Sequence, residues 1–168
     1  MLRTMRDAGL LSPAEFQRRR AEELERYRAA GMPPLQIWMF AYAWAVDRVE
    51  DAAEALAAKP ATLDAQLRAR QGRLLAGRIE LLAGDPARAK ELLSAGLASC
   101  SLAAGAPRDY LRGKLALGQA SERLGDMPGA CQAYRGVIER WGKAIPKSVT
   151  AVEAHARATA LGCPTEQR

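Results

Sequence analysis

The sequence is poor in the residues from which most catalytic and metal sites are built. It holds one histidine, three cysteines and nine aromatic residues in 168 positions. The histidine, His155, has no acidic or nucleophilic partner at helical spacing. No glycine-rich phosphate loop, Ser/Cys–His arrangement or paired-carboxylate pattern is found. We therefore expect no catalytic residue, no metal site, no cofactor and no enzymatic activity.

The cysteines, Cys100, Cys131 and Cys163, are far apart and form no CxxC pair. The spacing indicates neither a zinc site nor a disulfide framework. We expect buried, reduced thiols, which suit a cytoplasmic protein. The N-terminus lacks the apolar core of a signal peptide. The longest apolar run, Leu35–Val46, has 12 residues, which is too short to cross a bilayer, so no membrane association is expected.

Acidic residues are scarce toward the C-terminal end. The formal net charge is +6, and residues 105–168 carry ten Lys/Arg against six Asp/Glu. Such a surface attracts acidic partners in a salt-dependent way. It is not the dense basic stripe of a nucleic-acid-binding protein, so a nucleic-acid-associated regulator is only the weaker alternative.

What the sequence has in abundance is alanine, leucine and arginine, with few β-branched residues. This composition favours helix. Gly, Pro and Asp punctuate the helical stretches, and the length suits one compact domain or a short helical array. We expect an all-α fold.

Residues 10–16 carry a strong helix-start signal. Ser12 is the predicted N-cap, with Pro13 at the first helical position and Glu15 completing a capping box. Leu11 and Phe16 occupy the positions of a hydrophobic staple. The helix is predicted over residues 13–30 with its stop at Gly31. An earlier helix is predicted to end at Gly9.

This N-terminal string resembles the SHOCT-type motif, a unit of two short helices. The positions that carry the resemblance are Leu2, Met5, Gly9, Leu10, Leu11, Ser12, Glu15, Phe16 and Arg20. The resemblance covers about one seventh of the chain and implies a role in oligomerisation or tethering. A unit of this size buries too little apolar surface to stand alone, so it must dock on the rest of the chain or on another copy.

Four of the nine aromatic residues lie in one predicted helix, Leu35–Val46. On a helix Trp38 and Tyr42 share one face, and Phe40 and Trp44 share roughly the opposite face. Two interpretations stay open: a central core helix, or a helix buried on one side and offered to another chain on the other. The candidate oligomer contacts are Trp38, Phe40, Tyr42, Trp44, Phe16 and Leu24.

The segments 76–97 and 117–138 align without gaps at an offset of 41 residues, which indicates stacked helical hairpins. Gly84 and Gly125 can end a helix in the left-handed conformation. Asp85 and Asp126 then cap the next helix. Earlier glycines, Gly77 and Gly118, allow the two helices of each hairpin to approach closely, with Leu93 and Tyr134 as the larger fillers. Val149–Leu161 is predicted to be a terminal helix that starts at Ser148 and stops at Gly162.

The repeated pattern of Gly, Gly-Asp, Ala and a large residue resembles the tetratricopeptide repeat, and residues 117–138 match it at nearly every position. The resemblance implies a short right-handed solenoid of about seven to eight helices. It also implies a groove that binds a protein or an acidic peptide. The family's carboxylate clamp is not present in its usual form. The implied groove residues are Gln71, Leu74, Arg78, Leu81, Leu82, Arg112, Leu115, Gln119, Glu122 and Arg123.

The sequence thus predicts three regions: a SHOCT-like hairpin (1–31), a degenerate hairpin (32–60), and two tetratricopeptide-like hairpins with a capping helix (61–168). The predicted function is a non-catalytic scaffold that binds a protein or peptide partner. The alternative is self-assembly of the chain into a homo-oligomer through its N-terminal hairpin and aromatic helix. The C-terminal half is also similar to repeat tails of bacterial serine/threonine kinases, which implies a recruiting arm.

Overall fold

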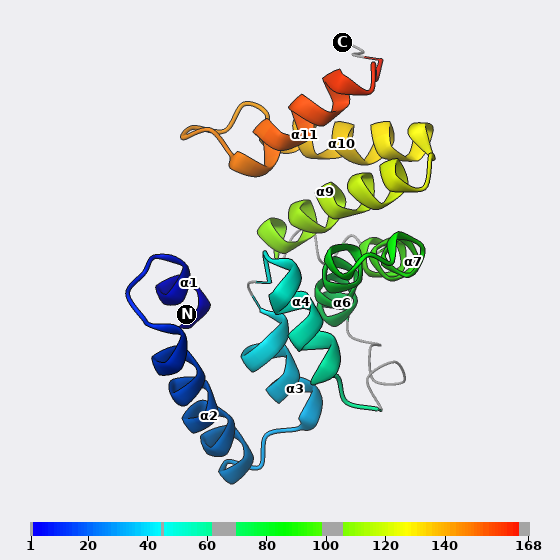
Figure 1. Ribbon diagram of the computed structural model, residues 1–168. Helices are drawn as coiled ribbons and strands as arrows, with labels where there is room; N and C mark the ends of the chain where they lie inside the picture. The colour runs from blue at the N-terminus through cyan, green and yellow to red at the C-terminus, as the bar shows by residue number, and fades with distance from the viewer. Residues whose placement is uncertain (1, 45, 62–69, 99–105, 165–168) are drawn as a thin grey trace. The chain divides into compact units, whose positions relative to one another are not determined.

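Figure 1 shows a computed structural model of the chain, which describes residues 2–44, 46–61, 70–98 and 106–164. Within these ranges the regular structure consists of nine α-helices and one π-helix, without strands. The all-α prediction is confirmed, with more helices than the seven to eight expected. The chain divides into two compact units, unit 1 (Met1–Leu67) and unit 2 (Arg68–Arg168). The predicted boundary between residues 31 and 32 falls inside unit 1.

The described helices of unit 1 begin with the predicted two-helix segment. Ser12 caps the second helix, because its Oγ accepts a hydrogen bond from the Glu15 N–H at 3.2 Å. Leu11 and Phe16 are both buried, as a hydrophobic staple requires. The helix ends before Gly31, whose φ is 66°. The elements are α1 (Leu2–Asp7), α2 (Pro13–Ala29), α3 (Pro34–Trp38), the π-helix η1 (Met39–Ala43) and α4 (Val49–Ala57).

The aromatic segment is not the single α-helix that its apolar run predicted. It starts as α3 and widens into η1, where the Trp44 N–H donates to the Met39 carbonyl five residues earlier, at 2.9 Å. Trp44 itself is extended, with ψ 133°. Phe40 and Trp44, which are four residues apart, still lie on one side of the segment, and their rings are stacked. A hydrophobic pattern alone does not distinguish this turn from an α-helical one.

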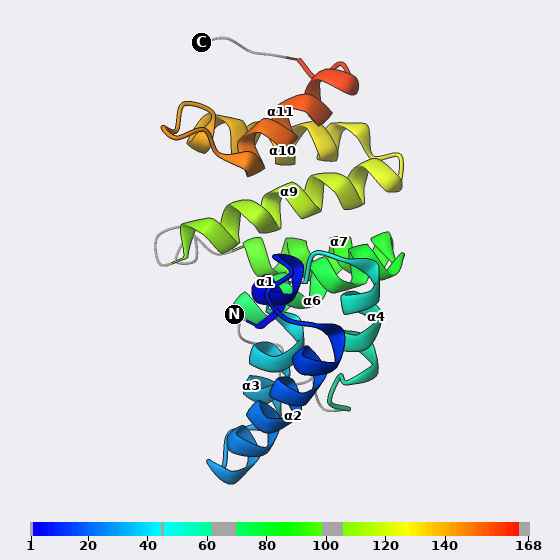
Figure 2. The same cartoon turned by 60° about the vertical axis from the view of Figure 1, so that its left-hand side comes forward.

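Unit 2 is a stack of helices in chain order (Figures 1 and 2). α6 packs along α7, α9 packs on both, α10 packs along α9, and α11 packs mainly on α10 with a smaller contact to α9. The stops at Gly84, Gly125 and Gly162 all have positive φ, as predicted. The elements are α6 (Arg70–Ala83), α7 (Pro86–Leu97), α9 (Pro107–Arg123), α10 (Met127–Trp141) and α11 (Val149–Ala160).

Each hairpin of unit 2 is closed by a large side chain that lies on a glycine, as the sequence predicted. A Cβ added at Gly77 would lie 2.6 Å from Leu93 Cγ, and one at Gly118 would lie 2.3 Å from Tyr134 Cε1. Both distances are shorter than any van der Waals contact. Small residues such as Ala89 and Ala130 are fully buried at the same crossings. The helices can therefore approach closely only because these positions carry no larger side chain.

The expectation of reduced thiols is wrong for two of the three cysteines. Cys131 of α10 and Cys163, just after α11, form a disulfide with Cα atoms 5.4 Å apart. The turn at Gly162 brings Cys163 against α10. A sequence separation of 32 residues gives no hint of this approach. Cys100 lies outside the described residues. Reduced thiols were one ground for expecting a cytoplasmic protein, and that ground no longer holds for this pair.

Candidate protein-interaction surfaces

The groove residues predicted on α6 divide between core and surface. Leu74 and Leu81 are buried in a cluster with side chains of α7 and α9. Arg78 and Leu82 are half-buried. The side chain of Gln71 lies outside the described residues. Leu74 and Leu81 therefore hold α6 to its neighbours, whereas Arg78 and Leu82 keep part of their surface exposed.

On α9 the predicted groove residues keep part of their surface and also contact other helices. Arg123 is exposed, and its Nη1 donates to the Leu81 carbonyl at 2.6 Å. Gln119 Nε2 donates to Glu153 of α11 at 2.7 Å. Half-buried positions on this helix are Arg112, Leu115, Gln119 and Glu122.

Glu122 is the centre of a polar network that joins three helices. It accepts hydrogen bonds from the Tyr134 hydroxyl at 2.6 Å and from Arg157 Nη1 at 3.2 Å. Arg157 Nε also donates to Glu153 at 3.2 Å. Burial, reinforced by the hydrogen bond to Glu122, raises the pKa of Tyr134 far above its ordinary value. The phenol therefore stays protonated and remains a donor, and the network fixes α11 beside α9.

A second surface feature of unit 2 is a shallow pocket of about 280 Å³, which is lined by residues of α7, α9 and α10. Tyr110 and Lys114 form part of its wall, with Lys114 Nζ 5.4 Å from the centre of the tyrosine ring. The sequence analysis did not single out this pocket, because its lining comes from three helices and follows no repeat position. The remaining lining residues are Ser94, Leu97, Ala98, Leu117, Gly129, Gln132 and Ala133.

The candidate oligomer contacts in unit 1 also divide between core and surface. Trp38 and Phe16 are each only 2% exposed. The Trp38 indole N–H donates to the Ala55 carbonyl at 2.8 Å, so its one polar group is paired inside the unit. Tyr42 and Leu24 are half-buried. Trp38 and Phe16 are core residues whose rings are not available to another chain in this structure.

Phe40 and Trp44 lie at the surface, with 50% and 43% of their area exposed. Their ring centroids are 6.1 Å apart in a stacked arrangement, and Tyr27 of α2 lies 6.4 Å from Phe40. We call these three residues the aromatic surface. Scattered apolar residues are ordinary on protein surfaces, but three neighbouring aromatic rings are an unusual exposed apolar feature.

Arg3 holds the C-terminal end of η1 beneath the aromatic surface. Its Nη1 donates to the carbonyls of Tyr42 and Trp44, the latter at 3.1 Å. The guanidinium is buried and lies 3.4 Å from Asp51 and 3.6 Å from Glu54. Burial, opposed by these two carboxylates, lowers the pKa of Arg3. Among the described residues, Nε and Nη2 of Arg3 find no hydrogen-bond partner, and the attraction of Asp51 and Glu54 is the interaction that compensates them.

Two more arginines complete this charged cluster. Arg6 donates to both Asp51 oxygens at 2.7 and 2.8 Å, and Arg20 donates to both oxygens of Glu54. Both guanidinium groups also lie over the Phe16 ring, at 4.9 and 5.1 Å from its centre. The cluster joins α1, α2 and α4. Sequence analysis missed it, because its partners are 34 to 51 residues apart.

The carboxylates of this cluster are held in the charged form. Burial opposes ionisation of Asp51, but the hydrogen bond from Arg6 and the charge of Arg3 outweigh it, and the pKa of Asp51 is lowered. The hydrogen bond from Arg20 lowers the pKa of Glu54. The cluster therefore keeps its ion pairs at neutral pH.

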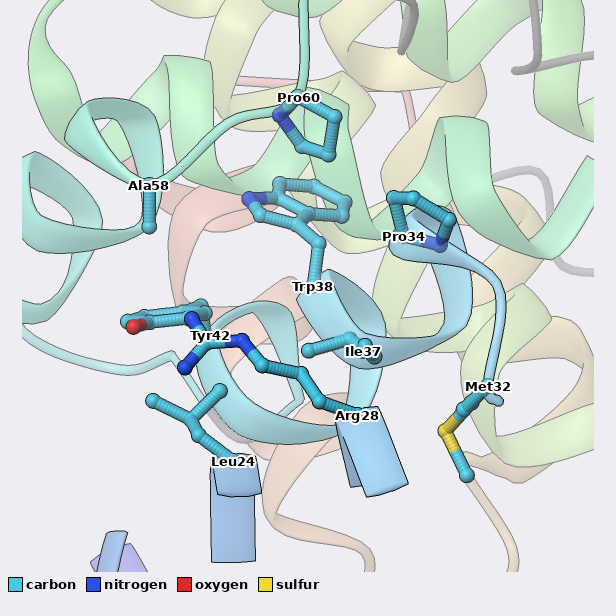
Figure 3. A pocket seen from close by; sticks show the side chains of 9 residues that line it. All are labelled: Leu24, Arg28, Met32, Pro34, Ile37, Trp38, Tyr42, Ala58 and Pro60. Atoms are coloured by element: carbon cyan, nitrogen blue, oxygen red, sulfur yellow. The ribbon is translucent and has the colours of Figure 1, made fainter. Parts of the chain in front are cut away.

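A larger open pocket, of about 490 Å³, lies on unit 1 and is shown in Figure 3. The Trp38 ring lies between Pro60 and Ile37, with Pro34 to one side (Figure 3). Arg28 crosses the pocket beside Leu24. The pocket is a candidate binding site, since mostly apolar walls with a few polar groups, here Arg28 and the Tyr42 hydroxyl, are typical of ligand sites. Its other lining residues are Met32, Tyr42 and Ala58.

Metal-binding side chains are scattered in the part of the chain that the structure describes. Within those ranges no group of three or more His, Cys, Asp or Glu residues could hold a metal ion. His155 is exposed, and its Nδ1 lies 3.5 Å from the Thr159 hydroxyl. None of the described helices has both the length and the apolar character needed to cross a membrane.

Comparison of the chain with known protein families, with curated proteins and with solved structures gave no match.

Proposed function

We propose that this chain is a non-catalytic protein-interaction scaffold whose unit 2 is a short, right-handed tetratricopeptide-like stack. The observation that carries the proposal is the repeated construction of its two hairpins. Each first helix ends at a glycine with positive φ, and each second helix is capped by an aspartate. The Asp85 and Asp126 side chains accept backbone hydrogen bonds at 2.9 and 3.0 Å. Stacked hairpins of this kind present extended surfaces for partner binding.

The surface that fits a partner best is the face of α6 and α9 that was predicted as the groove. Leu74 and Leu81 serve the core, so the recognition residues on α6 reduce to Arg78 and Leu82, and further positions lie on α9. Those positions are Arg112, Leu115, Gln119, Glu122 and Arg123. Arginine binds carboxylates through paired hydrogen bonds, so this surface suits an acidic segment of a protein or peptide.

Charge reversal tests this proposal. The full chain would be used to capture partners from its native source, beside an Arg78→Glu/Arg112→Glu variant and an Arg18→Glu/Arg19→Glu variant. Arg18 and Arg19 are exposed on α2 of unit 1, so their double reversal changes the net charge by the same amount and controls for it. We expect partners that are lost only in the double variant, with unchanged helicity by circular dichroism. A partner set that is the same for all three proteins would reject the groove.

The aromatic surface supports a second candidate function, self-assembly of the chain. Phe40 and Trp44 are stacked and exposed, and the SHOCT-like resemblance of the adjoining segment implies oligomerisation. Sedimentation velocity at several concentrations would test it on the full chain, with Phe40→Ser/Trp44→Ser as the variant. Leu10→Ser is the matched control, because Leu10 is 70% exposed on the same unit. A chain that stays monomeric at every concentration would exclude self-assembly.

A further inference from the structure

α11 is the last described helix of unit 2, and it has a helical neighbour on one side only (Figures 1 and 2). Its buried face consists of Ala151, Ala154 and Ala158, which pack against α10 and the start of α9. These three positions repeat at helical spacing. The opposite side of the helix is open to solvent along its length.

α9 shows what a helix in this stack does with a second face. Its first face, Gly113, Ala116 and Ala120, packs on the preceding hairpin. The residues two positions earlier form its second face, where Leu111 and Gly118 are covered by α10. α9 is therefore buried on two sides, once against the preceding hairpin and once against its own partner helix.

The equivalent second face of α11 is bare. The residues two positions before its buried alanines are Val149, Val152 and Ala156. Val149 is 82% exposed, Val152 is 56% exposed, and Ala156 is also exposed. No charged residue occupies these three positions, although an outward-facing end helix is normally polar. α11 thus has the apolar face of a hairpin helix, and no described helix of unit 2 covers that face.

The connection between α10 and α11, which leads directly into Val149, carries another exposed apolar side chain. It projects beyond the ends of both helices in the two views (orange in Figures 1 and 2). Ile145 in this connection is 98% exposed. Lys143 and Lys147 flank it, both exposed, and neither forms an ion pair within the described ranges. We call Val149, Val152, Ala156 and Ile145 the α11 outer face.

The residues that directly follow α11 do not turn back to cover this face. After Gly84 and Gly125 the next helix starts within two residues, at Pro86 and Met127. After Gly162 the next residue is Cys163, which is bonded to Cys131 of α10 and packs with the buried side of α11. The disulfide therefore directs the chain toward α10, away from the position of a hairpin partner.

We propose that the α11 outer face binds an acidic amphipathic helix of a partner protein, in the place that α10 takes on α9. The proposal rests on the scaffold function and names one site and one class of partner for it. Val149, Val152 and Ala156 are three and four residues apart, so they form one apolar stripe along α11, against which the apolar face of a partner helix can pack. Charge selects the occupant: unit 2 carries sixteen Lys/Arg against nine Asp/Glu, a net +7. Unit 2 of a second copy would bring like charge to this face, whereas carboxylates would pair with Lys143 and Lys147.

The direct test uses two synthetic peptides of about 18 residues, which is about five helical turns. One has leucine at every third and fourth position with glutamate and alanine elsewhere, and the other replaces each glutamate by lysine. Fluorescence anisotropy with the disulfide-bonded full chain would measure binding. We expect the glutamate peptide to bind in a salt-dependent manner, and no measurable binding of the lysine peptide.

Variants locate the site. Val152→Glu places a charge in the apolar contact and is expected to weaken binding about tenfold or more. Ala87→Glu adds the same charge at an exposed position of α7 and should leave the affinity within about twofold. Ile145→Ser changes a side chain that is almost wholly exposed, so it cannot unfold the stack, and it should weaken binding by a smaller factor.

Three results would overturn the inference. The first is no binding of the glutamate peptide, and the second is binding that neither Val152→Glu nor Ile145→Ser weakens. If such binding is instead lost in Arg78→Glu/Arg112→Glu, the scaffold function stands and only the α11 site is rejected. The third is a dimer of the chain alone that Val152→Glu dissociates, because the occupant would then be a second copy.

Discussion

Unit 1 and unit 2 are each stabilised internally, and the kind of contact that stabilises them differs. Unit 1 buries charged side chains: Arg3, Arg20 and Asp51 are at most 8% exposed. Its largest buried apolar side chain is that of Trp38. Unit 2 buries alanine and glycine at helix crossings and closes each hairpin with one large residue. Unit 1 carries nine Lys/Arg against ten Asp/Glu, whereas unit 2 has a net +7.

The difference shows that the same helical composition can specify a unit in two ways. Steric fit at close crossings repeats along a chain, since each hairpin needs only a glycine and a large residue at fixed spacing. A buried ionic cluster does not repeat, and it depends on partners brought together from three helices. We therefore expect unit 1 to respond to pH and to single charge removals, and unit 2 to respond mainly to changes of side-chain volume.

The largest expected effect is the loss of Trp38. Trp38→Ala removes a ring that is 2% exposed and leaves the Ala55 carbonyl without its donor. Such truncations cost about 3–5 kcal/mol, enough to unfold a marginal unit. Hydrogen exchange of the full chain should show lost protection in α2–α4 and unchanged protection in α9–α11. Equal loss of protection in both units would mean that they unfold together, and would contradict the expectation that each unit is stabilised by its own contacts.

The second-largest expected effect is the destabilisation of unit 2 by a larger side chain at a helix crossing. Gly118→Ala forces a methyl group against the Tyr134 ring and should destabilise by about 1–3 kcal/mol through overpacking. Gly136→Ala is the matched control on α10, because its Cβ would meet only the mobile end of Lys114. There the higher helix propensity of alanine should leave stability equal or improved by up to about 1 kcal/mol. Thermal unfolding by circular dichroism would compare them, and equal melting temperatures would refute the steric account.

Acid should act on unit 1 first. Asp51 and Glu54 have pKa values below their ordinary 3.8 and 4.5 in the folded chain. The unfolded state therefore binds protons more readily, and the stabilisation is complete above about pH 4.5 and lost as the pH falls through the folded values. Hydrogen exchange between pH 6 and 3 should show unit 1 losing protection before the core of unit 2.

Asp51→Asn provides the control for this acid response. The variant removes one titrating group and leaves Arg3 and Arg6 with a neutral partner, so it should be less stable at neutral pH. Its stability should then depend less steeply on pH between 6 and 3. A variant with the wild-type acid response would show that the carboxylate cluster is not the source of the pH dependence.

How much of this was predictable from the sequence differs between the units for the same physical reason. In unit 2 the stops at Gly84 and Gly125, the aspartate caps and the Gly118–Tyr134 contact were predicted, because local spacing determines each of them. The Cys131–Cys163 disulfide was not, since it depends on where α11 lies against α10. Contacts within a hairpin can be predicted from sequence spacing, and contacts with a helix outside the hairpin cannot.

In unit 1 the caps of α2 were predicted, and the interior was not. The shared side of Phe40 and Trp44 was predicted from their spacing, but the apolar run gave no sign of the π-helical turn. The ion pairs of Arg3, Arg6 and Arg20 look in the sequence like solvated surface charges. Of the candidate sites, the aromatic residues were identified but their burial was not, because helical periodicity assigns faces and does not say which face is covered.

The smallest effect tests whether burial, rather than charge itself, distinguishes unit 1. Arg18 forms ion pairs with Glu15 and Glu22 on the exposed side of α2, and such solvated pairs contribute little to stability. Arg18→Gln should therefore leave the melting temperature of the full chain unchanged within experimental error, whereas Arg20→Gln on the same helix should lower it clearly, because Arg20 is buried against Glu54 and Phe16. The two variants make the same chemical change two residues apart. Equal effects would mean that the net charge of α2, and not the buried cluster, stabilises unit 1.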